Sequence, residues 1–316
     1  MAMMTRGARL LMAVVPMVLA TAACAGTGVA TVDGARGGGA TGGGAGSGAT
    51  VAVRVERTGG FVPADLVLTR LPIVAIYADG QVIDEGPQIA IAPPPAWPNV
   101  QLRRIPVADV RRLVDRAVAA GIGTERDFGQ PPIADATSTR FTIRTASGVT
   151  RAEIPALLES DGSGLTAHQQ AARRAARSLY DALTDLPATL GAGAVGTSTT
   201  YLPAAVAAIA APWTDTCSSP DTTALAGTEP GGLCADGLPR QAERSWPGPA
   251  LPGEPLRADT ELSCVTARGD AATKVTAAAR QAVTTTAWRS GGKRWRVSLR
   301  PLLPDESGCA DVRRAS

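Results

Sequence analysis

The amino-acid sequence predicts an α+β protein with antiparallel sheets and two to four helices, arranged in two lobes. Short segments in which apolar and polar residues alternate are separated by glycine-containing turns, a pattern typical of antiparallel strands. Two longer segments repeat apolar residues at helical spacing, and a stretch dense in proline, glycine and threonine separates the patterned regions. We therefore predict an N-terminal α+β lobe over residues 51–190, a linker and disulfide-containing loop over 191–245, and a C-terminal βαββ lobe over 246–316.

Residues 1–23 have the three-part layout of a secretory signal peptide. Arg6 and Arg9 precede an apolar run from Leu10 to Ala20, and small residues follow. A helix that spans a bilayer needs about 20 apolar residues, whereas this run has 11 and contains a proline. The segment is therefore predicted to direct export rather than to remain as a transmembrane helix.

The small residues Thr21–Ala23 and the following Cys24 resemble a lipobox, in which the cysteine is acylated before the signal is removed. Thr21 stands where leucine is usual, and the alternative is cleavage at an A-x-A site, which would leave a soluble secreted protein. Two acyl chains on Cys24 would give stable anchoring, because one chain binds a bilayer only marginally. We expect a lipidated Cys24 on the outer face of the cell membrane, with the folded part extracytoplasmic.

Residues 24–50 are predicted to be the lipidated cysteine and a flexible tether. Residues 25–50 contain 11 glycines and no apolar periodicity, so they cannot bury a face against a core. Ordered structure is expected from Val51, where valines alternate with more polar residues.

Further strands of the N-terminal lobe are expected at 73–77 and 81–83, joined by a turn at Ala78-Asp79-Gly80, and at 99–105. A hairpin is expected around the turn Ala146-Ser147-Gly148, because Phe141 and Ile143 alternate with polar residues before it.

The clearest helix is predicted within residues 106–122, and a second, alanine-rich helix within about 165–186. The apolar stripe of the first consists of Val110, Leu113, Val114, Ala117 and Val118, and its solvated face of Arg111, Arg112 and Arg116. The short alanine-rich segment 204–211 is interpreted as helical.

In the C-terminal lobe we expect a strand at 261–267, a helix at 270–282 and a hairpin that turns at Ser290-Gly291-Gly292. Trp295, Val297 and Leu299 alternate along the second strand of this hairpin and should share one face.

The segment AIYADGQVI followed by a helix, together with the closing RPLLPDESGC, resembles uncharacterised exported lipoproteins of high-GC bacteria. The resemblance would cover most of the mature chain. It implies the compartment, and it implies no activity.

The cysteines other than Cys24 form an even set: Cys217, Cys234, Cys264 and Cys309. No CxxC spacing occurs, and an oxidising compartment favours two disulfides over a metal site. Three pairings are possible; we favour Cys217–Cys234, which closes the loop region, and Cys264–Cys309, which ties down the end of the chain.

Few residues suggest catalysis. The single histidine, His168, is interpreted as a surface or helix-cap residue, and Asp305 and Glu306 as solvated loop acids rather than an acid–base pair. Trp97 and Trp246 each precede a proline; we interpret them as packing over a loop, the alternative being an exposed partner-binding surface. No catalytic residue, cofactor or metal is predicted.

Outside the signal, 29 basic residues stand against 28 acidic ones, so no electrostatic footprint for nucleic acid is expected. Arginine outnumbers lysine 29 to 2 over the whole chain, so single arginines carry little information. The leading hypothesis is a non-enzymatic lipoprotein that binds an envelope protein or wall component. The alternative is a carboxylate-based hydrolase of an envelope polymer, which requires a cleft with two suitably spaced acids.

Overall fold

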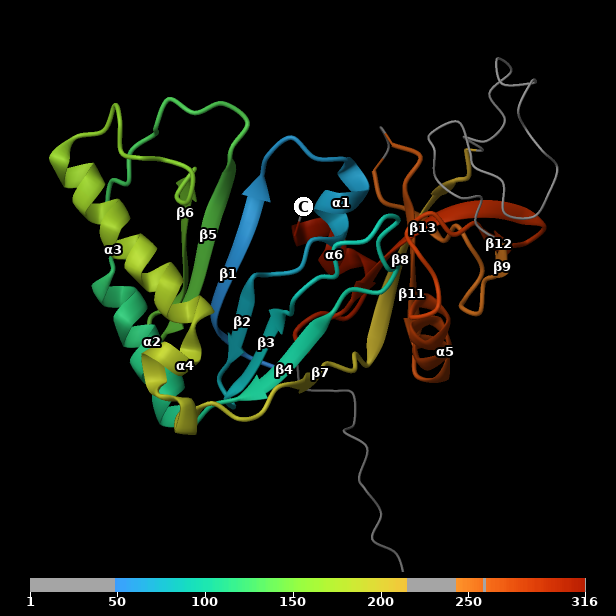
Figure 1. Ribbon diagram of the computed structural model, residues 1–316, viewed down its shortest axis with the longest axis horizontal. Coiled ribbons are helices and arrows are strands. Elements are labelled where there is room, and N and C mark those ends of the chain that lie inside the picture. The colour runs from blue at the N-terminus through green and yellow to red at the C-terminus, as the bar shows by residue number, and fades with distance from the viewer. Residues whose placement is uncertain (1–48, 215–242, 258–259, 316) are drawn as a thin grey trace, which may run out of the picture. The chain divides into compact units, whose positions relative to one another are not determined.

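The computed structural model describes residues 49–214, 243–257 and 260–315, which form two β-sheets that each pack against helices (Figure 1). The predicted signal peptide, Cys24 and nearly all of the predicted tether lie outside the described residues, as do Cys217 and Cys234. The described residues belong to one compact unit. The α+β class with antiparallel sheets is confirmed.

The first sheet has seven strands in the order β6-β5-β1-β2-β3-β4-β7, and every pairing in it is antiparallel. The strands are β1 Val51–Gly59, β2 Val74–Tyr77, β3 Gln81–Glu85, β4 Val100–Arg104, β5 Thr137–Thr145, β6 Gly148–Pro155 and β7 Thr199–Thr200. Both predicted hairpins, β2–β3 and β5–β6, are confirmed.

The turn between β2 and β3 depends on Gly80. Its φ is +86°, a conformation that favours glycine, and a Cβ at this position would lie 2.1 Å from the carbonyl oxygen of Ile105. The Asp79-Gly80 pair therefore fixes both the hairpin and the entry of the chain into the next helix, whose preceding residue Ile105 bonds to the Gly80 carbonyl.

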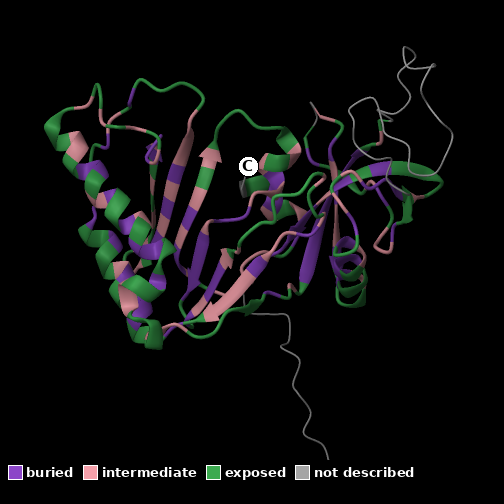
Figure 2. Ribbon diagram, in the orientation of Figure 1, coloured by how far each residue is buried: buried purple, intermediate pink, exposed green. Residues whose placement is uncertain are grey.

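Two long helices, α2 Val107–Ala119 and α3 Ala167–Thr184, pack on one face of this sheet. Figure 2 shows their buried residues turned to the sheet and their exposed residues turned away. In α2, Val110, Leu113 and Ala117 are buried as predicted, whereas Val118 is 42% exposed at the edge of the stripe. Thr166 begins α3 with a reciprocal capping box to Gln169. The short α4 Leu186–Leu190 and a 3₁₀ turn, Ala192–Ala194, follow.

The second sheet has six strands in the order β10-β11-β8-β13-β12-β9. They are β8 Ala205–Pro212, β9 Arg244–Ser245, β10 Glu254–Pro255, β11 Ser263–Arg268, β12 Trp288–Ser290 and β13 Lys293–Pro301. The pairings are antiparallel except for the short β9–β12 contact. Helix α5 Asp270–Ala279 packs on one face, and α1 Ala64–Thr69 and α6 Cys309–Ala315 pack on the other.

The prediction that residues 204–211 are helical is wrong, because they form β8 in the middle of the second sheet. Seven of its eight residues are buried, and β11 and β13 pair with it on either side. A strand covered on both faces is a continuous apolar run, so its sequence lacks the alternation of a half-buried strand. Pairing and burial on both faces outweigh the helix propensity of alanine here.

The described residues hold six α-helices where two to four were predicted. The additional ones, α1, α4 and α6, have only five to seven residues each, too short for a periodic pattern to be read. No helix among the described residues is long and apolar enough to cross a membrane.

The two sheets meet through side chains at one side of the first sheet. Tyr77 and Ile83 from this sheet pack with Tyr201 and Leu303, and the Tyr201 hydroxyl donates to the Leu302 carbonyl at 2.8 Å. The segment after β13, residues 302–308, is therefore in contact with the first sheet although it follows the second one along the chain.

Candidate functional site

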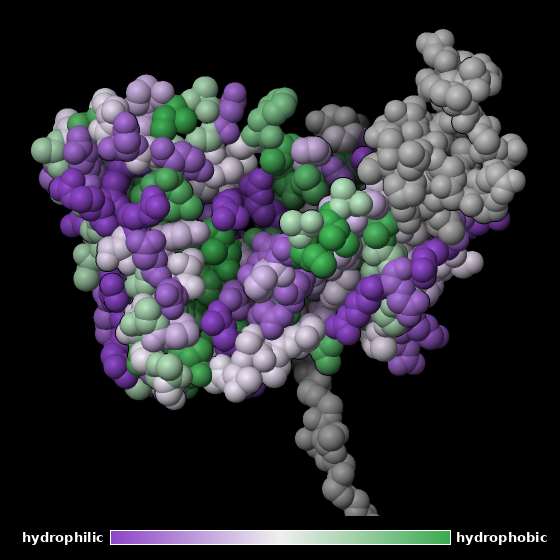
Figure 3. Space-filling view, in the orientation of Figure 1, coloured by the Kyte–Doolittle hydropathy of each residue, from purple (hydrophilic) through white to green (hydrophobic). Residues whose placement is uncertain are grey.

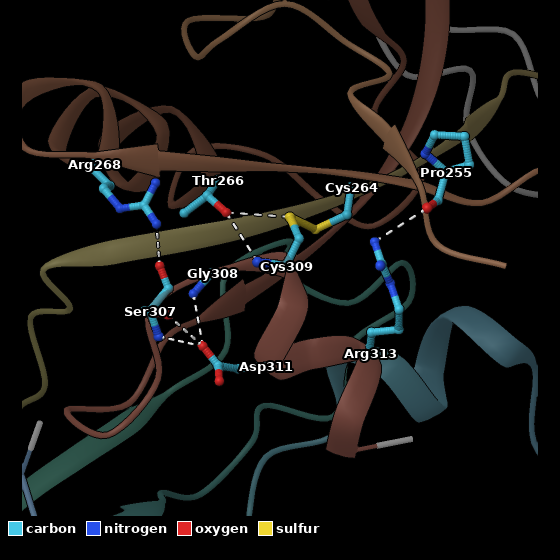
Figure 4. Close-up of a disulfide and its surroundings, with 9 residues drawn as sticks. All are labelled: Pro255, Cys264, Thr266, Arg268, Ser307, Gly308, Cys309, Asp311 and Arg313. Atoms are coloured by element: carbon cyan, nitrogen blue, oxygen red, sulfur yellow. Dashed lines mark hydrogen bonds between the residues drawn. A yellow bond between two sulfur atoms is a disulfide. The ribbon is translucent and has the colours of Figure 1, made fainter.

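The predicted bridge between Cys264 and Cys309 is present, with a Cα–Cα distance of 5.9 Å. Figure 4 shows that it joins β11 to the first residue of α6, and that the Thr266 hydroxyl accepts a hydrogen bond from the Cys309 amide at 3.2 Å. The bridge holds the C-terminal helix against the second sheet. The other predicted pair, Cys217–Cys234, lies outside the described residues.

Asp311 organises the turn that precedes α6. Its Oδ2 accepts hydrogen bonds from the Ser307 amide at 2.6 Å, the Ser307 hydroxyl at 2.8 Å and the Gly308 amide at 3.1 Å (Figure 4). Partial burial raises the pKa of Asp311, but the hydrogen bonds from Ser307, Gly308 and Arg314 outweigh burial, so the pKa lies below its ordinary value.

The interpretation of Asp305 and Glu306 as solvated acids is wrong. Asp305 Oδ1 accepts from Arg54 Nη2 and from the Tyr77 hydroxyl, each at 2.7 Å, and its side chain is 23% exposed. Glu306 is only 7% exposed and accepts from Arg300 Nη2 at 2.5 Å and from the Leu303 amide at 2.9 Å. Both acids are structural partners of arginines.

The contacts of Asp305 escape sequence analysis because its partners are far away in the chain. Arg54 and Tyr77 come from β1 and β2, more than 200 residues before Asp305. Burial lowers the pKa of Arg54, but the charges of Asp305, Tyr77 and Glu56 together raise it above its ordinary value. Burial raises the pKa of Tyr77.

The other candidates behave as interpreted. His168 is exposed near the start of α3. Trp97 and Trp246 are each 9% exposed and belong to the core on the α5 side of the second sheet. Trp246 Nε1 donates to the Pro249 carbonyl at 2.7 Å, and its ring meets Trp288 edge to face at 5.5 Å. They are packing residues. Arg111, Arg112 and Arg116 are exposed on α2, and Figure 3 shows many hydrophilic side chains over the part of the molecule that holds the two long helices.

The candidate functional site is a cleft of about 700 Å³. No sequence pattern indicated it. One wall is the face of β1, β5 and β6 opposite the long helices, and the other is the C-terminal segment from Asp305 to Arg314. In Figure 1, β1 and α6 lie next to each other here. The rim includes residues 49–51, where the described part of the chain begins.

Strand register places four arginines around Thr142 in this cleft. Arg54 on β1 and Arg151 on β6 lie directly opposite Thr142, and Arg140 and Arg144 lie two positions away from it along β5. Directly opposite side chains are about 4.5–5.5 Å apart at Cβ, and diagonal neighbours about 7–8 Å apart. All four arginines line the cleft.

The four arginines differ in their partners. Arg54 pairs with Asp305, and Arg140 pairs with Glu153 at 2.9 Å, with Glu56 opposite it on β1. The side chains of Arg144 and Arg151 are exposed and make no ion pair or hydrogen bond with any described residue. The end of the cleft near the β5–β6 turn is therefore cationic, whereas at the opposite end Glu56, Glu153 and Asp305 surround Arg140 and Arg54 and leave a small excess of negative charge.

The acids that line the cleft are poorly arranged for acid–base chemistry. The oxygens of Glu306 and Asp311, and Oδ1 of Asp305, already accept structural hydrogen bonds. Glu56 is the one lining carboxylate without a hydrogen bond among the described residues, whereas glycoside hydrolysis uses two. No group of three or more potential metal-ligating side chains occurs in the described ranges.

Comparisons with protein-family models, curated proteins and solved structures found no match to this chain.

Proposed function

We propose that this chain is an exported lipoprotein, anchored through Cys24 on the outer face of the cell membrane, which binds an envelope protein or wall component without transforming it. The observation that carries the binding role is the cleft between the first sheet and the C-terminal segment. It combines two arginines that have no described partner with carboxylates that, apart from Glu56, are engaged in structural contacts.

The charges of the cleft favour binding over hydrolysis. A general acid and base must exchange protons with the substrate, so their oxygens need to be accessible and paired at a suitable separation. Here Asp305 and Glu306 hold the wall of the cleft in place instead. Exposed guanidinium groups, in contrast, are donors ready for a ligand.

The position of the cleft fits an anchored protein. Residues 49–51 line it, and 24 residues lie between Cys24 and Ala49. A chain of that length reaches at most about 90 Å in any conformation. A component bound in the cleft would therefore be held within that reach of the lipid anchor.

Site-specific photocrosslinking in intact cells tests this proposal. A photoreactive residue replaces Val149, which lines the cleft and is 38% exposed, and, as the matched control, Val118, which is 42% exposed on α2. We expect a discrete crosslinked species from position 149 and none of that mass from position 118. The same products from both positions, or none from 149, would argue against the cleft as the binding site.

A further inference from the structure

We propose that Arg144 and Arg151 bind an oxyanion, a carboxylate or phosphate group carried by an anionic polymer of the envelope. This inference rests on the proposed binding function and names the chemistry of its ligand. It follows from the strand register, which brings two unpaired cations together at one end of a cleft.

Arg144 and Arg151 concentrate positive charge at one end of the cleft. Arg144 on β5 and Arg151 on β6 are diagonal neighbours, because Arg151 lies opposite Thr142 and Arg144 lies two positions further along β5. Like charges directly opposite each other destabilise a sheet, and long side chains at diagonal positions are still within reach of each other, so the two guanidinium groups repel each other. The neighbouring Arg140 is balanced by Glu153 and Arg54 by Asp305, whereas no described carboxylate balances this pair. An anion between the two guanidinium groups would remove the repulsion.

The hydrogen-bond donors at this end of the cleft suit an oxyanion. A guanidinium offers several N–H groups in a planar fork that matches the oxygens of carboxylate and phosphate. Thr142 lies on β5 two positions from Arg144 and directly opposite Arg151 on β6; it lines the same cleft and makes no side-chain hydrogen bond with a described residue. Its hydroxyl can supply a further donor. Two arginines and a hydroxyl on one rigid sheet form a preorganised anion site.

The charge of the cleft differs between its two ends. Glu56 and Glu153 flank Arg140 at the other end, so a chain with many negative groups would be repelled there. An anionic polymer should therefore contact the cleft with one or a few of its groups at the Arg144 end. The rest of the polymer should extend away from the cleft past the β5–β6 turn.

The test uses the full chain purified in detergent, with inorganic phosphate, short polyphosphate and poly-L-glutamate as probes and uncharged dextran as the negative control. Binding is measured by titration calorimetry and by the rise in melting temperature, since a ligand that binds only the folded state stabilises it. The variant Arg144→Gln/Arg151→Gln is compared with Arg111→Gln/Arg116→Gln. The second variant removes the same charge from exposed, unpaired arginines on α2.

We expect polyphosphate, poly-L-glutamate or both to bind the wild-type chain, more weakly as salt rises. Affinity should fall about tenfold for each cleft arginine removed, because charge-assisted hydrogen bonds are lost. The α2 variant should bind almost as well as wild type. The two polymers distinguish a phosphate ligand from a carboxylate ligand, and equal binding would mean that the site accepts either.

Equal losses in the two double variants would overturn the proposal, because they would indicate attraction by net charge alone. Failure of every probe to bind would also overturn it. The unliganded cleft variant should melt no lower than wild type, since a repulsion has been removed, and this measurement excludes misfolding as the cause of lost binding. A specific crosslink at position 149 combined with no anion binding would leave the binding function standing and refute only the ligand class.

Discussion

Arg300 and Glu306 form the most buried ion pair among the described residues, with exposed side-chain fractions of 2% and 7%. Arg300 also donates through Nη1 to the Arg70 carbonyl, and Glu306 accepts from the Leu303 amide at 2.9 Å. The pair thus links β13, the residue that follows α1 and the start of the C-terminal segment. Removing one partner should reveal how strongly this junction depends on it.

Glu306→Ala should lower the free energy of unfolding by about 3–5 kcal/mol, because it leaves the Arg300 charge buried without a counter-ion. Arg300→Met/Glu306→Gln keeps the side-chain volumes and an acceptor for the Leu303 amide while removing both charges. Replacing both members of a buried pair is often nearly neutral, so the double variant should recover most of the loss.

Urea unfolding of the purified chain, followed by circular dichroism, measures these differences. Asp181→Ala is the matched control, because it breaks the exposed pair with Arg177 on α3, where the side chains are 47% and 65% exposed. Its effect should stay within about 0.5 kcal/mol. A loss from Glu306→Ala no larger than that of the control, or a double variant as unstable as the single one, would refute the assignment of Glu306 as the essential counter-ion.

Three further outcomes are expected. Cys24→Ala should release the protein from the membrane fraction or leave it unprocessed, as fractionation and mass measurement would show; a variant that stays in the membrane at its mature mass would contradict lipidation. Reduction of Cys264–Cys309, 45 residues apart, should destabilise the fold by about 4 kcal/mol on the loop-entropy model, with amide exchange accelerating in α6 and β11 before α2. The pKa of Asp311 is lower in the folded state than in the unfolded state. The ionised side chain therefore stabilises the fold at pH values above the pKa of the unfolded state, and this stabilisation is lost as the pH falls through the pKa of the folded state. The protection factors of the α6 amides should therefore fall in acid, and Asp311→Asn should show lower protection at neutral pH and respond less to acid.

Local periodicity was sufficient to predict most of the first sheet and its two helices. Phe141 and Ile143 alternate with polar residues, and Val110, Leu113 and Ala117 recur at helical spacing, so each element carries its own signal. Periodicity failed at β8, because a strand buried on both faces has no polar face to reveal it.

The cleft was predictable only in part. Alternation along β5 places Arg140, Thr142 and Arg144 on the face away from the core, and this much follows from the sequence. The opposite wall does not follow, because no local pattern shows that Asp305 will meet Arg54 from a strand 251 residues earlier. The abundance of arginine in this chain further hides the few that gather at one place.

The wall formed by the C-terminal segment is attached to the rest of the fold at two points. Asp305 fixes its beginning to β1 and β2, and the Cys264–Cys309 bridge fixes the start of α6 to β11. A wall held at two points loses little conformational entropy when a ligand binds, so more of the interaction energy appears as affinity. The disulfide therefore contributes to the proposed site without touching the ligand. Since Arg144 and Arg151 lie on the sheet and not on this wall, reduction should weaken binding less than removal of the two arginines does.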